Sequence, residues 1–166
     1  RLDVGRQLLT YPEGLHEGAR DRGIRRQVRD ARREHAGVQR LVRDLNTLYR
    51  GVPALYEMDC DPAGFEWVDT SNEADSIITF LRKDKHGGPV LVVCNFTPKP
   101  HHGYRVGVPR DGFWREAMNT DADIYGGSNV GNMGGRQADA FGVNGRPFSL
   151  ELSIPPLATM VFVPEE

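Results

Sequence analysis

Few residue patterns in this sequence have the types and spacing that catalysis requires. A strained Gly-x-Ser-x-Gly turn would indicate a hydrolytic serine, but the nearest stretch, 126–130 (GGSNV), has Val130 where the second glycine is required. No glycine-rich segment is followed by Lys and then Ser or Thr, as a phosphate-binding loop requires. The sequence therefore indicates neither an acyl-transfer nucleophile nor a nucleotide-binding loop.

Paired carboxylates are a second chemistry that the sequence could support. Cleavage of a glycosidic bond needs two carboxyl groups roughly 5–10 Å apart, one of them with a raised pKa. Several acids flank predicted strands, but their spacing selects no pair among them: Asp59, Asp61, Asp69, Asp75 and Asp84. We therefore assign no catalytic residue.

A calcium loop is suggested only in part by the segment that begins at Asp121. Asp121, Asp123 and Gly126 occupy positions 1, 3 and 6 of such a loop. Tyr125 stands at position 5, however, and Asn132 replaces the bidentate Glu of position 12. A structural role for this segment is favoured.

Two adjacent histidines, His101 and His102, could each contribute a metal-binding nitrogen. Adjacent residues of a strand point to opposite faces, and no Cys or carboxylate partner is suitably spaced. An exposed turn is favoured, and we expect neither a metal nor a cofactor.

Three aromatic residues could bind sugar, because a flat aromatic face packs against the apolar face of a pyranose ring. Trp67 and Trp114 lie inside strand-like runs, where burial in the core is the favoured alternative. Tyr125 lies in a glycine-rich loop, where the two alternatives are balanced. Trp67, Trp114 and Tyr125 are the candidate carbohydrate-binding residues.

The composition suits one domain with an appendage: 166 residues, of which 39% are hydrophobic. Residues 1–50 hold twelve Arg and seven acids, whereas the remainder is acidic. The basic residues alternate with acids, as on a solvated helix face, which disfavours nucleic acid as a partner. No apolar run approaches the roughly 20 residues of a membrane helix, so no membrane contact is expected.

The elements change from helical to extended near residue 61. Val38, Leu41, Val42, Leu45 and Leu48 recur at steps of three and four, which predicts an amphipathic helix that Gly51 and Pro53 terminate. After Asp61, short runs rich in β-branched and aromatic residues predict seven strands. They are 65–68, 76–82, 90–96, 104–108, 113–119, 148–154 and 158–163.

This count of strands predicts a sandwich or a barrel. Between residues 120 and 147 the sequence holds seven glycines and predicts one long loop. Loops of such length are uncommon in compact domains and are often functional or poorly ordered.

Several segments resemble glycogen (1,4-α-glucan) branching enzymes of the α-amylase superfamily. The longest, 35–46 (HAGVQRLVRDLN), continues with 48–50 (LYR) and 53–55 (PAL) and resembles the last helix of their catalytic barrel. Shorter matches resemble their C-terminal β domain: 61–62 (DP), 64–67 (GFEW), 95–98 (NFTP), 103–105 (GYR), 107–109 (GVP), 119–121 (NTD), 125–128 (YGGS), 131–132 (GN), 145–147 (GRP) and 155–159 (PPLAT).

The resemblance implies an enzyme that cuts an α-1,4-linked glucan, holds it on an Asp and rejoins it through an α-1,6 bond, with a Glu as acid and base. In that family these residues lie in the barrel, upstream of the matched part, so no residue here inherits a catalytic role. The expected function is that of a non-catalytic C-terminal fragment of a branching enzyme in glycogen biosynthesis. A glucan-binding module and a purely structural domain that stabilises the barrel are the alternatives.

The expected fold is mainly β: an antiparallel β-sandwich preceded by one or two α-helices from the end of a (β/α)8 barrel. Residues 1–55 are assigned to the helical tail and 56–166 to the all-β domain. The family passes almost directly from a run like 8–12 (LLTYP) to the run that begins at His35. Residues 13–34 are therefore an apparent insert, which we interpret as an additional helix or a reading-frame artefact.

The remaining expectations concern the surroundings of the chain. It opens on Arg1 without a signal sequence and reads as a fragment. Two cysteines, Cys60 and Cys94, favour a reducing compartment, and the cytoplasm is expected. The expected partner is the catalytic barrel, with α-glucan as a candidate ligand. Without the barrel, the apolar helix stripe should find another partner or remain exposed, and either self-association or a frayed N-terminus is expected.

Overall fold

The computed structural model describes residues 17–70, 72 and 74–165. One long helix, α1 (Glu17–Gly51), is followed by short 3-10 turns, η1 (Pro53–Leu55) and η2 (Pro62–Gly64), and then by strands. The strands are β1 (Phe65–Asp69), β2 (Ile77–Lys83), β3 (Pro89–Asn95), β4 (His101–Val108), β5 (Phe113–Asn119), β6 (Gly135–Gln137), β7 (Phe148–Ile154) and β8 (Ala158–Pro164). A third 3-10 turn, η3 (Asp123–Tyr125), lies between β5 and β6.

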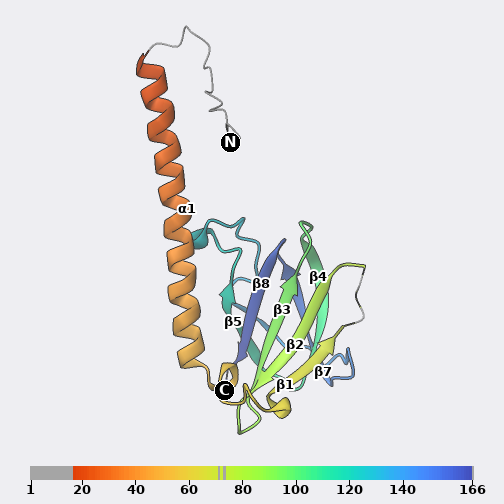
Figure 1. Ribbon diagram of the computed structural model, residues 1–166. Coiled ribbons are helices and arrows are strands. Elements are labelled where there is room, and N and C mark those ends of the chain that lie inside the picture. The colour runs from red at the N-terminus through yellow and green to blue at the C-terminus, as the bar shows by residue number, and fades with distance from the viewer. Residues whose placement is uncertain (1–16, 71, 73, 166) are drawn as a thin grey trace, which may run out of the picture.

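The strands form two antiparallel sheets that face one another. Six strands pair in the order β1-β2-β3-β8-β5-β6, and β4 pairs with β7 in a separate two-stranded sheet. Figure 1 shows the strands as two layers, with α1 standing along one side and its N-terminal half projecting beyond them. The predicted antiparallel, mainly β fold is confirmed, and each of the seven predicted strands is present.

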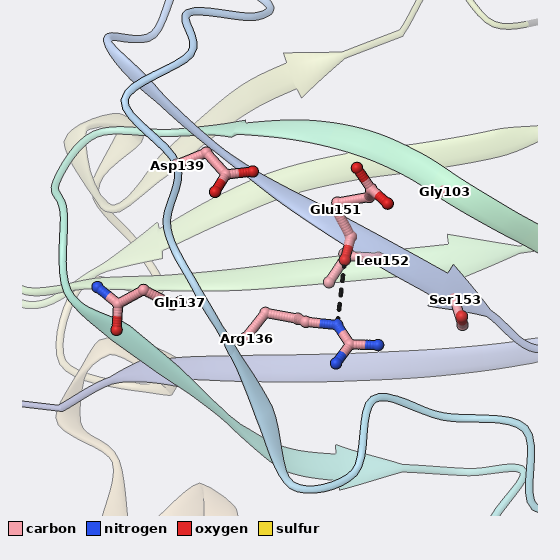
Figure 2. A pocket seen from close by; sticks show the side chains of 7 residues that line it. All are labelled: Gly103, Arg136, Gln137, Asp139, Glu151, Leu152 and Ser153. Atoms are coloured by element: carbon pink, nitrogen blue, oxygen red, sulfur yellow. Dashed lines mark hydrogen bonds between the residues drawn. The ribbon is translucent and has the colours of Figure 1, made fainter.

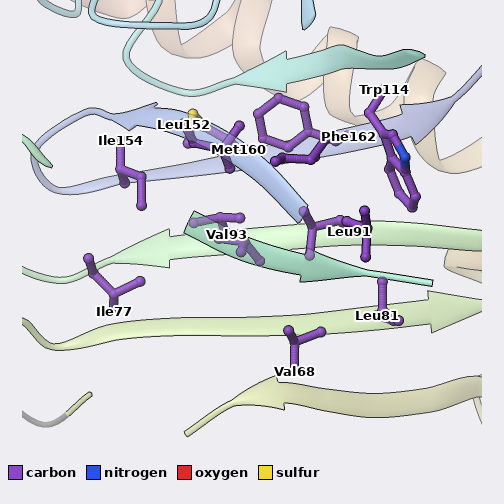
Figure 3. Packing of buried hydrophobic residues seen from close by; sticks show 13 residues of the cluster. Val68, Ile77, Leu81, Leu91, Val93, Trp114, Leu152, Ile154, Met160 and Phe162 are labelled. Carbon is purple, nitrogen blue, oxygen red and sulfur yellow. The ribbon is translucent and has the colours of Figure 1, made fainter. Parts of the chain in front are cut away.

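The core lies between the two sheets. Leu91 and Val93 of β3, Met160 and Phe162 of β8, and Trp114 of β5 point into it and are fully buried. Figure 3 shows these side chains interlocking, with Leu152 and Ile154 from β7 closing the cluster. The alternation of the strands supplies this face, since every second residue points inward.

The outer face of the six-stranded sheet is also apolar at its centre. Val90 and Val92 of β3 and Val161 of β8 lie there and are buried. A strand that is covered on both faces reads as a continuous hydrophobic run, which explains the composition of β3 and β8. The cover on this side is α1 with η1, through Leu41, Leu48 and Ala54 among others.

Residues 17–34 extend the same helix that contains residues 35–51. This part of the apparent insert is therefore helical, and its helix continues through residue 34 into residues 35–51 without interruption. The helix ends at Gly51, as predicted, and Pro53 starts the next turn. Residues 1–16, including the start of the apparent insert and the 8–12 segment, lie outside the described residues.

The long glycine-rich segment is more structured than the sequence indicates. It contains η3 and β6, and Asp121 organises its first half. The Asp121 carboxylate accepts hydrogen bonds from Ser128 N at 2.9 Å, Ser128 Oγ at 2.7 Å and Val130 N at 3.0 Å. The prediction of a single long loop is wrong for residues 135–137, which pair with β5.

Candidate functional site

The helix α1 meets the β domain through one narrow face. Leu41 and Leu48 pack on the outer face of the sheet, and Gly37 lies against the backbone of Tyr125 in η3. A Cβ atom added to Gly37 would stand 2.4 Å from the Tyr125 carbonyl oxygen, so only glycine permits this approach. The helix position therefore depends on a close backbone contact.

Tyr125 also binds the helix with its side chain. Its Oη donates a hydrogen bond to Asp44 Oδ2 at 2.8 Å. Burial, followed by the hydrogen bond to Asp44 and the charge of that carboxylate, raises the pKa of Tyr125 to about 12. This candidate sugar-binding residue thus lies at the seam between helix and β domain, with its hydroxyl already engaged.

The flank of the helix next to this face carries an exposed helix stripe: Val38, Val42, Leu45 and Tyr49. Their side chains are 58%, 52%, 40% and 47% exposed. Of the two alternatives expected for the apolar stripe, Leu41 and Leu48 find a partner in the β domain. Val38, Val42 and Leu45 remain exposed among the described residues, because the stripe is wider than the face that the sheet covers.

A second exposed apolar area lies on the outer face of β1 and β2. Trp67 stands opposite Phe80 across the two strands, and its ring contacts Phe80 and Phe65 edge-on at centroid distances of 6.0 Å and 4.8 Å. Trp67 is 53% exposed. Phe65, Trp67 and Phe80 form the aromatic cluster of this face, and the predicted burial of Trp67 is wrong.

Trp114 occupies the opposite environment. Its side chain is 0% exposed in the core between the sheets, and its Nε1 donates to the Arg110 carbonyl oxygen at 3.4 Å. The favoured prediction of burial is confirmed for this residue. An indole that presents no face to solvent has no surface on which a sugar ring could stack.

The acids that flank the strands serve local structure. Asp61 accepts from Ala63 N at 2.8 Å and caps η2, and Asp84 accepts from His86 N and Gly88 N, each at 2.8 Å, in the β2–β3 turn. Asp59 pairs with Arg82, and Asp75 accepts from Asn72. The geometry therefore assigns these four carboxylates to caps, turns and ion pairs.

The metal-binding patterns weighed from the sequence likewise meet other partners. His102 Nδ1 lies 3.3 Å from Ser153 Oγ, and His101 Nδ1 lies 3.9 Å from Asp75 Oδ1. Over residues 17–165, as far as they are described, no three His, Cys, Asp or Glu side chains gather as metal ligands would. In the same part of the chain, no helix is long and apolar enough to cross a membrane.

The structure is thus an antiparallel all-β domain with one helix packed on the outer face of its larger sheet. The chain matches the family described as "Alpha amylase, C-terminal all-beta domain" over residues 67–165 and belongs to this family.

Relatives with high identity carry one name. The chain is 57% identical over 130 residues to the 1,4-alpha-glucan branching enzyme GlgB of Cereibacter sphaeroides, covering 78% of this chain and 18% of the relative. The enzyme of the same name from Aquifex aeolicus is 58% identical over 127 residues, covering 76% and 20%. That of Synechococcus elongatus is 53% identical over 128 residues, covering 76% and 16%. The chain thus spans about a fifth of the length of these curated relatives.

Proposed function

We propose that this chain is the C-terminal part of a 1,4-α-glucan branching enzyme and that this part is itself non-catalytic. The observation that carries the proposal is the identity of 51–58% with enzymes of that name, of which the chain spans about a fifth. Membership of an all-β C-terminal family supports the assignment to that end of the enzyme.

The role of the chain in this proposal is to pack on the catalytic barrel. The exposed helix stripe, Val38, Val42, Leu45 and Tyr49, is the surface that the barrel covers. The relatives contain a further part that could cover this stripe, because about four fifths of their length lies outside the matched part. Burying three half-exposed aliphatic side chains contributes about 1 kcal/mol each, which favours a fixed arrangement of the two parts.

A branching assay tests the absence of catalysis. Purified chain is incubated with amylose, and the product is treated with a debranching enzyme that releases chains at α-1,6 bonds. We expect no released chains. Formation of α-1,6 branches by the 166 residues alone contradicts the proposal.

A chimera tests the assignment itself. The segment of the Aquifex aeolicus enzyme that matches this chain is replaced by the chain, and branching activity is compared with that of the same enzyme truncated before the segment. We expect activity in the chimera and little in the truncated enzyme. Val42→Glu in the chimera should lower activity and thermal stability together, whereas Met133→Glu, at a 98% exposed position away from the helix, should leave both unchanged.

A second candidate function, binding of α-glucan, is favoured by one specific observation. Of the three aromatic residues proposed from the sequence, Trp67 has a widely exposed ring, and Phe65 and Phe80 extend its apolar surface. Migration of the chain in native gels that contain glycogen measures this binding. Retardation that Trp67→Ala removes supports the candidate function, and unchanged mobility of the unmodified chain contradicts it.

The proposed location is the cytoplasm. Both cysteines that the sequence contains, Cys60 and Cys94, are free thiols in the structure, which suits a reducing compartment. Fractionation of cells with an antibody against the chain tests this location.

A further inference from the structure

A polar cleft lies on the face of the molecule opposite the helix. It has a volume of about 360 Å³ and is lined by Gly103, Arg136, Gln137, Asp139, Glu151, Leu152 and Ser153. Glu151 and Ser153 alternate along β7 with Leu150, Leu152 and Ile154, which point into the core. The cleft therefore opens on the outer face of the two-stranded sheet, and packing of a barrel on α1 would leave it accessible.

An arginine fixes the two carboxylates of the cleft. Arg105 Nη1 donates to Asp139 Oδ2 at 2.8 Å, and its Nη2 donates to Glu151 Oε2 at 2.8 Å. Figure 2 shows the second arginine, Arg136, beside Glu151, and its Nε donates to the Glu151 carbonyl oxygen at 3.2 Å. The positive charges of the two arginines thus balance the negative charges of the two carboxylates. The cleft therefore carries no net charge that would attract an ion.

The remaining hydrogen-bonding capacity is mixed in kind. Within the described part of the chain, no hydrogen bond involves the terminal nitrogens of Arg136, the Gln137 amide, or the second carboxylate oxygens of Asp139 and Glu151. Donors and acceptors therefore lie next to one another in the cleft. A hydroxyl group donates and accepts at once, so vicinal hydroxyl groups match such an arrangement better than a phosphate or a metal ion does.

A glycine lines the cleft, and an aromatic side chain lies beside Arg105, the arginine that holds the two carboxylates. Gly103 has φ +68° where the register of β4 and β7 shifts, a conformation that favours glycine, and it therefore adds no side chain to the lining of the cleft. Phe141 lies under the Arg105 guanidinium at 5.1 Å and is 57% exposed. The Phe141 ring thus supports the arginine that orients the carboxylates, and the cleft itself offers the mixture of donors and acceptors that a polyhydroxylated ligand requires.

We propose that this cleft binds a neutral polyhydroxylated ligand, and that the ligand is a segment of α-glucan. The choice of α-glucan among such ligands rests on the proposed function. The cleft is separate from the aromatic cluster of Phe65, Trp67 and Phe80, which lies on the outer face of the other sheet. Two sites on different faces would let one domain hold two stretches of a branched polymer.

The test is a titration of the isotopically labelled full chain with maltohexaose, followed by backbone amide chemical shifts. We expect shifts at residues 103, 136–139 and 151–153. Arg136→Met keeps the side-chain stem but removes the donors, and it should weaken binding about fivefold. The matched control is Arg50→Met, because Arg50 Nε also donates to a backbone carbonyl, that of Asn46 at 3.1 Å, but lies on the helix. This control should leave binding unchanged.

Three other outcomes overturn the proposal. Shifts in the cleft with inorganic phosphate but not with maltohexaose would make it an anion site. Maltohexaose shifts confined to the aromatic cluster, lost in Trp67→Ala but not in Arg136→Met, would leave glucan binding in place without the cleft. The absence of any shift would remove the cleft as a glucan site, while the chimera assay judges the branching-enzyme assignment independently.

Discussion

The hydroxyl group of Tyr125 donates to the carboxylate of Asp44 at 2.8 Å, across 81 residues of sequence. The backbone of the same tyrosine also contacts Gly37, which lies two helical turns before Asp44. Asp44 and Gly37 lie on one face of α1 because they are seven residues apart. Tyr125, the last residue of η3, thus fixes both the position of α1 along its axis and its rotation on the β domain.

Removal of the Tyr125 hydroxyl should loosen the helix without unfolding the sandwich. The seam between α1 and β5 also contains a cleft of about 340 Å³ beside Asp44, Leu48 and Tyr125, so the hydrogen bond lies where helix and sheet are not closely packed. Tyr125→Phe removes one hydrogen bond to a charged acceptor, which contributes about 1.5–3 kcal/mol. Faster amide hydrogen exchange over residues 37–51, with unchanged exchange in β3 and β8, is expected. Unchanged exchange in the helix would show that the hydrogen bond does not hold it.

A single methyl group at Gly37 should have a similar effect for a different reason. Ala favours a helix by about 1 kcal/mol relative to Gly, but the added Cβ would meet the Tyr125 carbonyl at 2.4 Å, so helix and η3 must separate. We expect Gly37→Ala to lower the thermal midpoint. Gly51→Ala is the control, because a Cβ there meets nothing within 4 Å. If Gly37→Ala raises the thermal midpoint instead, the contact between residue 37 and the Tyr125 backbone can widen at little cost.

Alkaline pH should weaken the attachment of the helix. The pKa of Tyr125 is raised to about 12 from an ordinary value of 10, so the folded state holds the phenolic proton more tightly than the unfolded state does. Its contribution to the free energy of unfolding is present below about pH 10. It is lost as the pH rises through about 12, where the phenolate would face the Asp44 carboxylate.

The measurement is the difference in free energy of unfolding between the unmodified chain and Tyr125→Phe, at a series of pH values from 8 to 12. The difference should be constant up to about pH 10 and then shrink. If this difference in free energy of unfolding grows with pH, its sign is wrong for a raised pKa of Tyr125. That result would contradict the role of the Tyr125 hydroxyl.

The strands could be predicted because each one carries its own local signal. Alternation marked β7, and β-branched runs marked β3 and β8. The three-residue strand β6 was missed, since Gly135, Arg136 and Gln137 have no alternation and pair only because β5 lies beside them. The division of the strands between two sheets is likewise set by packing and not by local sequence.

The candidate sites were less predictable for the same reason. Trp67 and Trp114 both stand in strand-like runs, yet one is half exposed and the other fully buried. Trp67 points to the outer face of the sheet, which α1 covers only at its centre, and β1 lies at the edge of that sheet. No pattern within residues 65–69 indicates which part of the sheet the helix covers. The cleft was missed because its residues come from three strands and a connecting segment, and no sequence motif joins Arg136 to Glu151.

The exposed helix stripe should make the isolated chain associate with itself. Val42→Gln with Leu45→Gln removes apolar surface at two exposed positions without altering charge. Sedimentation velocity over a hundredfold range of concentration should show association in the unmodified chain and a monomer in the double variant. Met133→Gln, also exposed but on the glycine-rich segment, should still associate. A chain that is monomeric throughout would contradict this proposal.

Asn132 should be the polar residue on which the glycine-rich segment most depends. It is 0% exposed; its Nδ2 donates to Glu116 Oε2 at 2.8 Å, and its Oδ1 accepts from Ser153 N at 2.9 Å. The residue thereby ties the segment to β5 and β7. Asn132→Ala would leave the Ser153 backbone N–H without its acceptor. It would also remove one hydrogen bond to the half-buried Glu116 carboxylate, which keeps the bond from the backbone N–H of residue 132 at 2.8 Å.

A backbone N–H left without its acceptor costs about 1–3 kcal/mol, so Asn132→Ala should lower the free energy of unfolding by about that amount in chemical denaturation. Asn46→Ala, at an exposed helix position, should change it by less than about 0.5 kcal/mol. Because the segment after Asn132 leads directly into β6, the same variant should also disturb the amide shifts of Arg136 and Gln137 in the polar cleft. A loss of stability without that disturbance would mean that β5 alone, through its pairing with β6, fixes this side of the cleft.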